Sequence, residues 1–186
     1  MDVIECIIKY GELGFTHVIP MGFDHILFIL SLFLLSSDLK TVFLQCTVFT
    51  IAHSISLALA ASSVIIPNSN YVEPIIAASI LYTSIENIVD SKIKRWRLLI
   101  VFIFGLIHGM GFASALSEIG LPKSNFLTAL VSFNIGVELG QISVLVLAWF
   151  CFAKWFANKP WYKTKLTYPL SALIACIALY WLVERL

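Results

Sequence analysis

The chain has 186 residues, of which 60% are hydrophobic and 12% are charged, and its mean hydropathy is +0.94. These values exclude an ordinary soluble globular domain and indicate a polytopic membrane protein. The formal net charge of +1 gives no electrostatic basis for binding nucleic acid. We therefore expect the lipid bilayer to be the main surroundings of this protein.

The apolar segments predict an all-α bundle of about six transmembrane helices in a single domain, residues 1–186. Residues 1–16 are only mildly amphipathic, and we expect them to lie along the membrane interface. A spanning helix needs about 20 predominantly apolar residues. Six later segments meet this requirement: 18–36, 41–63, 71–90, 98–118, 126–152 and 166–183.

Basic residues are concentrated in the first, third and fifth loops of this scheme. These loops hold 9 of the 12 Lys and Arg residues: Lys40, Lys92, Lys94, Arg95, Arg97, Lys154, Lys159, Lys163 and Lys165. Cytoplasmic loops carry an excess of Lys and Arg. We therefore expect these loops to face the cytoplasm and both termini to lie outside.

Ionisable side chains lie where the bilayer makes them costly. All four histidines and three carboxylates lie in or beside the apolar segments: His17, His25, His53, His108, Asp24, Glu86 and Glu138. A charged group at the bilayer centre costs about 2.5–3.5 kcal/mol on insertion scales. Imidazole and carboxylate ligands together suit a divalent transition metal. The sequence therefore predicts an intramembrane metal site, with its core in residues 17–152 and a basic loop and last helix in 153–186.

The start of the first span has an irregular pattern. Pro20 and Gly22 separate His17 from the adjacent Asp24 and His25, which favours a broken or late-starting helix. His17 has two interpretations, as a metal ligand or as an interfacial histidine. Asp24 suits a helix N-terminus, and it is also placed to bind a ligating histidine, a common arrangement around protein-bound metals.

A short motif recurs in the second and fourth spans. F-x3-H ends at His53 and again at His108, and a carboxylate follows in the next span each time. The separations are 33 residues to Glu86 and 30 residues to Glu138. This pattern suggests a parallel repeat of two helix hairpins, each giving one histidine and one carboxylate to a shared centre.

Polar residues near these positions predict supporting contacts. Ser54, Asn87, Asn134 and Gln141 are placed to orient metal ligands by hydrogen bonds. The alternative is hydrogen bonding between helices, which contributes only about 0.6 kcal/mol for each bond.

Several motifs in the same order resemble the HupE/UreJ family of bacterial membrane proteins, and its second branch more closely. They are H-x6-D-H from His17, F-T-x-A-H-S around His53, E-N at Glu86, F-G-L-x-H-G-x-G-F-A around His108 and F-N-x-G-V-E-x-G-Q around Glu138. The resemblance implies a multi-pass protein of the prokaryotic inner membrane. Typical members are regarded as nickel or cobalt permeases, and their first-span ligands would correspond to His17, Asp24 and His25.

The chain departs from the typical members at two motifs. It has six residues rather than five before Asp24, and its fourth span keeps only His108 of a motif that carries two histidines and a glutamate. The metal identity is therefore left open among zinc, nickel and cobalt.

A metal-ion permease is the first of three functional hypotheses. Its outer entrance would be His17, Asp24 and His25, and its inner cage would be His53, Glu86, His108 and Glu138. Six spans are few for an alternating-access transporter, which favours a homo-oligomer.

An intramembrane metal-dependent hydrolase or peptidase, acting on a lipid or a membrane peptide, is the second hypothesis. His25, His53 and His108 would bind zinc and leave one open position, with Glu86 or Glu138 as the general base. No HExxH motif is present, which disfavours this hypothesis. The third hypothesis is a structural membrane subunit whose polar cluster only forms hydrogen bonds.

Overall fold

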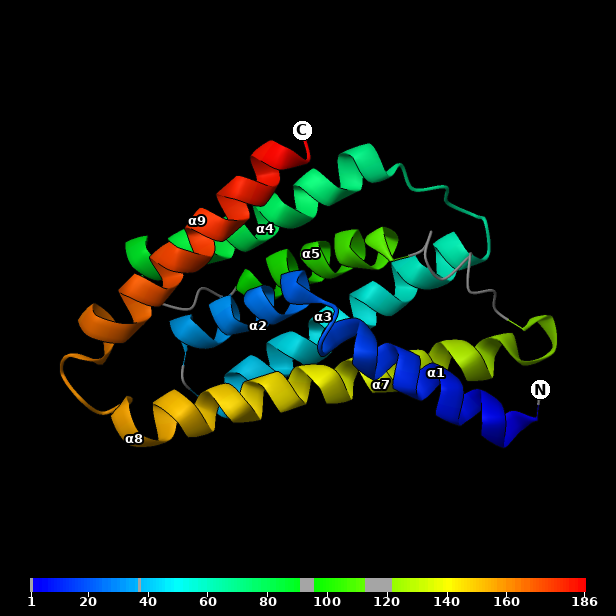
Figure 1. Ribbon diagram of the computed structural model, residues 1–186, viewed down its shortest axis with the longest axis horizontal. Coiled ribbons are helices and arrows are strands. Elements are labelled where there is room, and N and C mark those ends of the chain that lie inside the picture. The colour runs from blue at the N-terminus through cyan, green and yellow to red at the C-terminus, as the bar shows by residue number, and fades with distance from the viewer. Residues whose placement is uncertain (1, 37, 91–95, 113–121) are drawn as a thin grey trace.

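The computed structural model describes residues 2–36, 38–90, 96–112 and 122–186, and it contains helices and no strands in these ranges (Figure 1). The helices are α1 (Val3–Val18), α2 (Phe23–Leu35), α3 (Leu39–Ala61), α4 (Ser69–Val89), α5 (Arg97–Gly111), α7 (Phe126–Ala148), α8 (Lys154–Phe156) and α9 (Tyr168–Glu184). A π-helical turn, Trp149–Ala153, joins α7 to α8, and another, Lys163–Thr167, precedes α9. The predicted all-α membrane bundle is confirmed.

Within the described ranges, four helical stretches are long and apolar enough to cross a membrane. They are Leu39–Ala61, Ser69–Val89, Phe126–Phe156 and Lys163–Glu184. A fifth crossing is formed if α1 and α2 act together as one span, bent by 65°. α5 is apolar but shorter, and the end of the predicted fourth span, 113–118, lies outside the described residues. The prediction of six spans is therefore approximate.

The first predicted span, 18–36, is interrupted. α2 has only 13 residues, about 20 Å of helix, which is too short to cross a bilayer alone. The break contains a cis peptide bond between Ile19 and Pro20, followed by Gly22. A Cβ at Gly22 would lie 2.2 Å from the carbonyl oxygen of His17. Glycine therefore allows the end of α1 and the start of α2 to approach closely.

α2 occupies the middle of the bundle, between α4 on one side and α7 on the other (Figure 1). α3 packs along α5, α4 packs along α9, and α1 packs along α7. The first turn of α2 points one side chain into this arrangement, although Phe23 beside it is exposed. His25, in that turn, is only 2% exposed.

α1, for which the sequence predicts an interfacial position over residues 1–16, lies directly against α7. Its buried face repeats every four residues: Cys6, Tyr10, Gly14 and Val18. A Cβ at Gly14 would lie 1.9 Å from the carbonyl oxygen of Phe133, so the two backbones are in direct contact. The opposite face of α1 is apolar and exposed, including Ile4 and Ile8.

Replacing Gly136 with alanine should destabilise this helix crossing. The added Cβ would lie 2.1 Å from the carbonyl oxygen of Gly11, so α1 would have to move away from α7. Overpacking of this kind typically costs about 1–3 kcal/mol. The midpoint of thermal unfolding of the detergent-solubilised protein measures the effect. Gly11→Ala is the matched control, since its Cβ would lie 3.8 Å from the nearest oxygen, on Ser132. Equal midpoints for the two variants would contradict the close crossing.

Candidate metal centre

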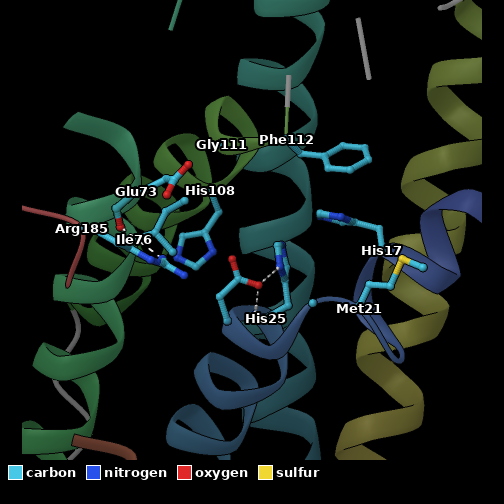
Figure 2. Close-up of a pocket in the computed structure, with 11 residues that line it drawn as sticks. His17, Met21, His25, Glu73, Ile76, His108, Gly111, Phe112 and Arg185 are labelled. Carbon is cyan, nitrogen blue, oxygen red and sulfur yellow. Dashed lines mark hydrogen bonds and ion pairs between the residues drawn. The ribbon is translucent and has the colours of Figure 1, made fainter. Parts of the chain in front are cut away.

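The four histidines, which come from four different helices, meet at the centre of the bundle. His17 lies in the last turn of α1, His25 in the first turn of α2, His53 in α3 and His108 in the last turn of α5. His25, His53 and His108 are at most 2% exposed. The break between α1 and α2 returns the chain so that His17 and His25 face one another, with ring centres 4.6 Å apart (Figure 2).

Two groups of side chains in the described ranges could hold a metal ion, and His25 belongs to both. One group is His17, His25 and His53, and the other is Asp24, His25 and His108. In each group, one potential ligand atom from every residue lies within 4.8 Å of the others. Ligands of a tetrahedral ion with bonds of 2.0–2.1 Å are about 3.4 Å apart. Small side-chain rotations would therefore close either group around one ion.

Five ring nitrogens in this cluster are buried without a hydrogen-bond partner among the described residues. They are His17 Nε2, His25 Nε2, His53 Nδ1, His53 Nε2 and His108 Nδ1. A buried polar group left without a partner costs about 1–3 kcal/mol. Native proteins rarely accumulate several such groups in one place. A bound metal would satisfy one nitrogen of each ring that contacts it, because the nitrogen with the lone pair of a neutral imidazole is a common metal ligand.

Hydrogen bonds orient two of the histidines and select their tautomers. Ser79 donates its hydroxyl hydrogen to the Ile76 carbonyl (2.7 Å), so it accepts the hydrogen of His108 Nε2 at 3.0 Å. Similarly, Asp24 Oδ1 accepts from His25 Nδ1 at 3.1 Å. Each bond leaves the other ring nitrogen with a free lone pair. Such partners commonly fix the orientation of metal-ligating histidines.

A cavity of about 380 Å³ opens beside the histidines. His17, Asp24, His25 and His108 line it, as Figure 2 shows for the three histidines. Glu73 at the start of α4 and Arg185 beyond α9 also line it, and Figure 2 shows them on the side of His108, opposite His17. Sequence reasoning missed Ser79 as a histidine partner and missed both Glu73 and Arg185.

Aromatic rings close the centre on the side away from this cavity. The rings of Phe28 and Phe49 lie 5.3 Å and 5.0 Å from the ring of His108, and both side chains are buried. Beyond them, buried polar side chains form a connected line. Ser31 donates to Thr83 at 2.7 Å, and Asn87 donates to the Ser31 carbonyl and to Ser171.

The two predicted glutamates lie outside both groups. Glu86 forms an ion pair with Arg97, which also donates to Gln45 at 2.8 Å. Arg97 was predicted in a loop, but it begins α5 and is 2% exposed. Glu138 accepts a hydrogen bond of 2.8 Å from Thr47.

The predicted supporting residues form hydrogen bonds within or between helices. Ser54 donates to the Thr50 carbonyl and Asn134 to the Leu130 carbonyl. Gln141 donates to the Thr50 hydroxyl, which links α7 to α3. Gln141 and Asn87 therefore bond between helices, whereas Ser54 and Asn134 bond within their own helices.

Comparison with known proteins identifies one family. The family described as HupE / UreJ protein matches residues 2–185. No curated protein matches the chain, and no solved structure matches it. The matched range includes all four histidines, Asp24 and the cavity residues Glu73 and Arg185.

Proposed function

We propose that this chain, which belongs to the HupE/UreJ family, is a permease for a divalent transition metal. One observation carries the proposal: five buried ring nitrogens without partners converge from four helices beside a cavity. The link of this family to nickel and cobalt handling supports the same conclusion. Nickel, cobalt and zinc all suit imidazole ligands, and the ion is the cargo of the protein rather than a fixed part of it.

In this proposal the protein lies in the prokaryotic inner membrane with the cavity facing outside. Glu73 and Arg185 line the cavity at the start of α4 and just beyond α9, whereas the basic loops lie at the other ends of these helices. An ion would enter from outside and bind the histidines. Movement of Phe28 and Phe49 would then give it access to the polar line around Ser31.

The orientation predicts that both termini lie in the periplasm. A C-terminal fusion should therefore activate alkaline phosphatase, which works only outside the cytoplasm, and should leave a cytoplasmic reporter inactive. A fusion in the loop near Lys159 should give the reverse pattern. Cytoplasmic activity at the C-terminus would contradict the proposed orientation.

Uptake into proteoliposomes tests the permease function. Wild-type protein should carry radiolabelled nickel, cobalt or zinc into vesicles, and the His53→Ala/His108→Ala variant should reduce the rate to that of empty vesicles. Ser143→Ala is the control, because Ser143 is exposed and only bonds the Leu139 carbonyl of its own helix. No flux of any of these ions, under a proton gradient of either direction, would contradict a permease.

A metal-dependent hydrolase remains the second candidate, and one observation favours it. His17, His25 and His53 form a three-histidine set, the number of protein ligands typical of catalytic zinc, and the cavity offers space for a substrate. In that case the vesicles should transport nothing, while the metal-loaded protein should cleave a lipid or a membrane peptide. In the permease proposal, residues 17–152 hold the metal, and residues 153–186 supply the basic loop and the last helix.

A further inference from the structure

The cavity is larger than a metal ion needs. Its volume is about 380 Å³, whereas six waters around an ion occupy roughly 180 Å³ at about 30 Å³ each. Pockets for small organic ligands begin near 300 Å³. The space beside the histidines therefore fits an ion that arrives together with a small organic molecule.

A guanidinium group lies on the wall across from His17. Arg185 is partly buried, stacks over the Trp181 ring at 5.2 Å and makes one long hydrogen bond, 3.5 Å, to the Glu73 carbonyl (Figure 2). In the part of the chain that the structure describes, no ion pair joins Arg185 to a carboxylate. Most of its five N–H donors are therefore free to bind a ligand.

The described lining of the cavity carries two carboxylates, Asp24 and Glu73, and one guanidinium, Arg185. Asp24 bonds His25, so a cation is favoured among the histidines. An anionic group is favoured at Arg185. Its guanidinium favours a ligand with a carboxylate, because arginine binds carboxylates through paired, charge-assisted hydrogen bonds. A metal ion chelated by carboxylates can bind both groups: the metal binds the histidines, and a free carboxylate oxygen accepts hydrogen bonds from Arg185.

We propose that the substrate is a small carboxylate chelate of the metal, recognised through Arg185. This inference rests on the proposed metal-transport function and names the form in which the ion is bound. Arg185 contacts the organic part of the substrate, whereas Asp24, His25 and His108, the ligand group whose members all line the cavity, contact the metal.

Equilibrium binding to the purified full-length protein tests the proposal with three nickel probes. They are the aqua ion, the 1:1 citrate complex and the ethylenediamine complex, which has no carboxylate. Wild-type protein should bind the citrate complex at least about tenfold more tightly than either other form, as expected for charge-assisted hydrogen bonds. Arg185→Gln should abolish this preference and leave binding of the aqua ion unchanged or tighter.

Lys9→Gln is the matched control, because Lys9 carries the same charge at the same predicted side of the membrane but does not line the cavity. It should keep the preference for citrate. An equal affinity of the wild type for the three probes would overturn the chelate proposal while leaving metal binding intact. Equal weakening of all three by Arg185→Gln would show a structural role and would also overturn it. Failure of the wild type to bind any probe would instead overturn the metal-binding function itself.

Discussion

Replacing His25 with alanine should remove bound metal more completely than any other single substitution. His25 belongs to both potential ligand groups, whereas His17, His53 and His108 each belong to one. Loss of a residue that only positions a ligand typically weakens metal binding by 10–100-fold. We expect His25→Ala to weaken metal binding by more than about 100-fold. Ser79→Ala should weaken it by about tenfold, since Ser79 orients His108 without contacting the metal. Elemental analysis and metal titration of the purified variants measure both effects.

Ser84→Ala provides the control for the loss of a buried polar group. Ser84 is fully buried and its hydroxyl has no partner among the described residues, but it belongs to neither group. This variant should retain metal at the wild-type level. If His25→Ala and Ser84→Ala retain equal amounts, the histidine cluster is a structural feature rather than a metal site.

Hydropathy predicted the long spans well, because each of these helices carries enough apolar surface by itself. The expected segments 41–63 and 71–90 correspond closely to α3 (Leu39–Ala61) and α4 (Ser69–Val89). The predicted first span, 18–36, did not include α1, which packs against α7 through glycine. The contact of Gly14 with Phe133 depends on a residue more than 100 positions away, and composition carries no signal for such a pairing.

The residues of the site that could be predicted are those of a type that is rarely buried in a membrane segment. Histidine in an apolar segment is rare enough to attract attention, and all four histidines do lie together. Ser79 gave no distinct signal, because serine in a membrane helix commonly bonds a neighbouring helix. Arg185 follows the last span, where a basic residue is ordinary. Only the three-dimensional arrangement brings it to the cavity that His17 lines.

Glu86 illustrates the limit of pattern reasoning, because an intramembrane carboxylate can serve a metal or a buried cation. The sequence placed Arg97 in a cytoplasmic loop, so Glu86 was expected to bind a metal rather than a cationic side chain. In the structure the two side chains form a buried ion pair that Gln45 extends. The pair joins the end of α4 to the start of α5, and it therefore fixes the helix that carries His108.

Glu86→Ala should consequently lower stability strongly and leave metal binding nearly unchanged. Removing one partner of a buried ion pair leaves an uncompensated charge and typically costs about 3–5 kcal/mol. Arg97 is 2% exposed and one of its nitrogens, Nη2, has no partner among the described residues, so water cannot easily replace the carboxylate. Thermal unfolding in detergent measures the loss of stability. Metal titration at a temperature where the variant is still folded measures metal binding separately.

The double variant Glu86→Leu/Arg97→Met distinguishes an ion pair from a metal ligand. Replacing both partners with apolar residues of similar size is often neutral for stability, because no charge is left buried. We therefore expect the double variant to recover most of the unfolding midpoint that Glu86→Ala loses, with wild-type metal stoichiometry. If Glu86 were instead a ligand, both variants would lose metal and the second substitution would restore nothing. A metal stoichiometry that falls equally in Glu86→Ala and in His25→Ala would thus contradict the role that the ion pair assigns to Glu86.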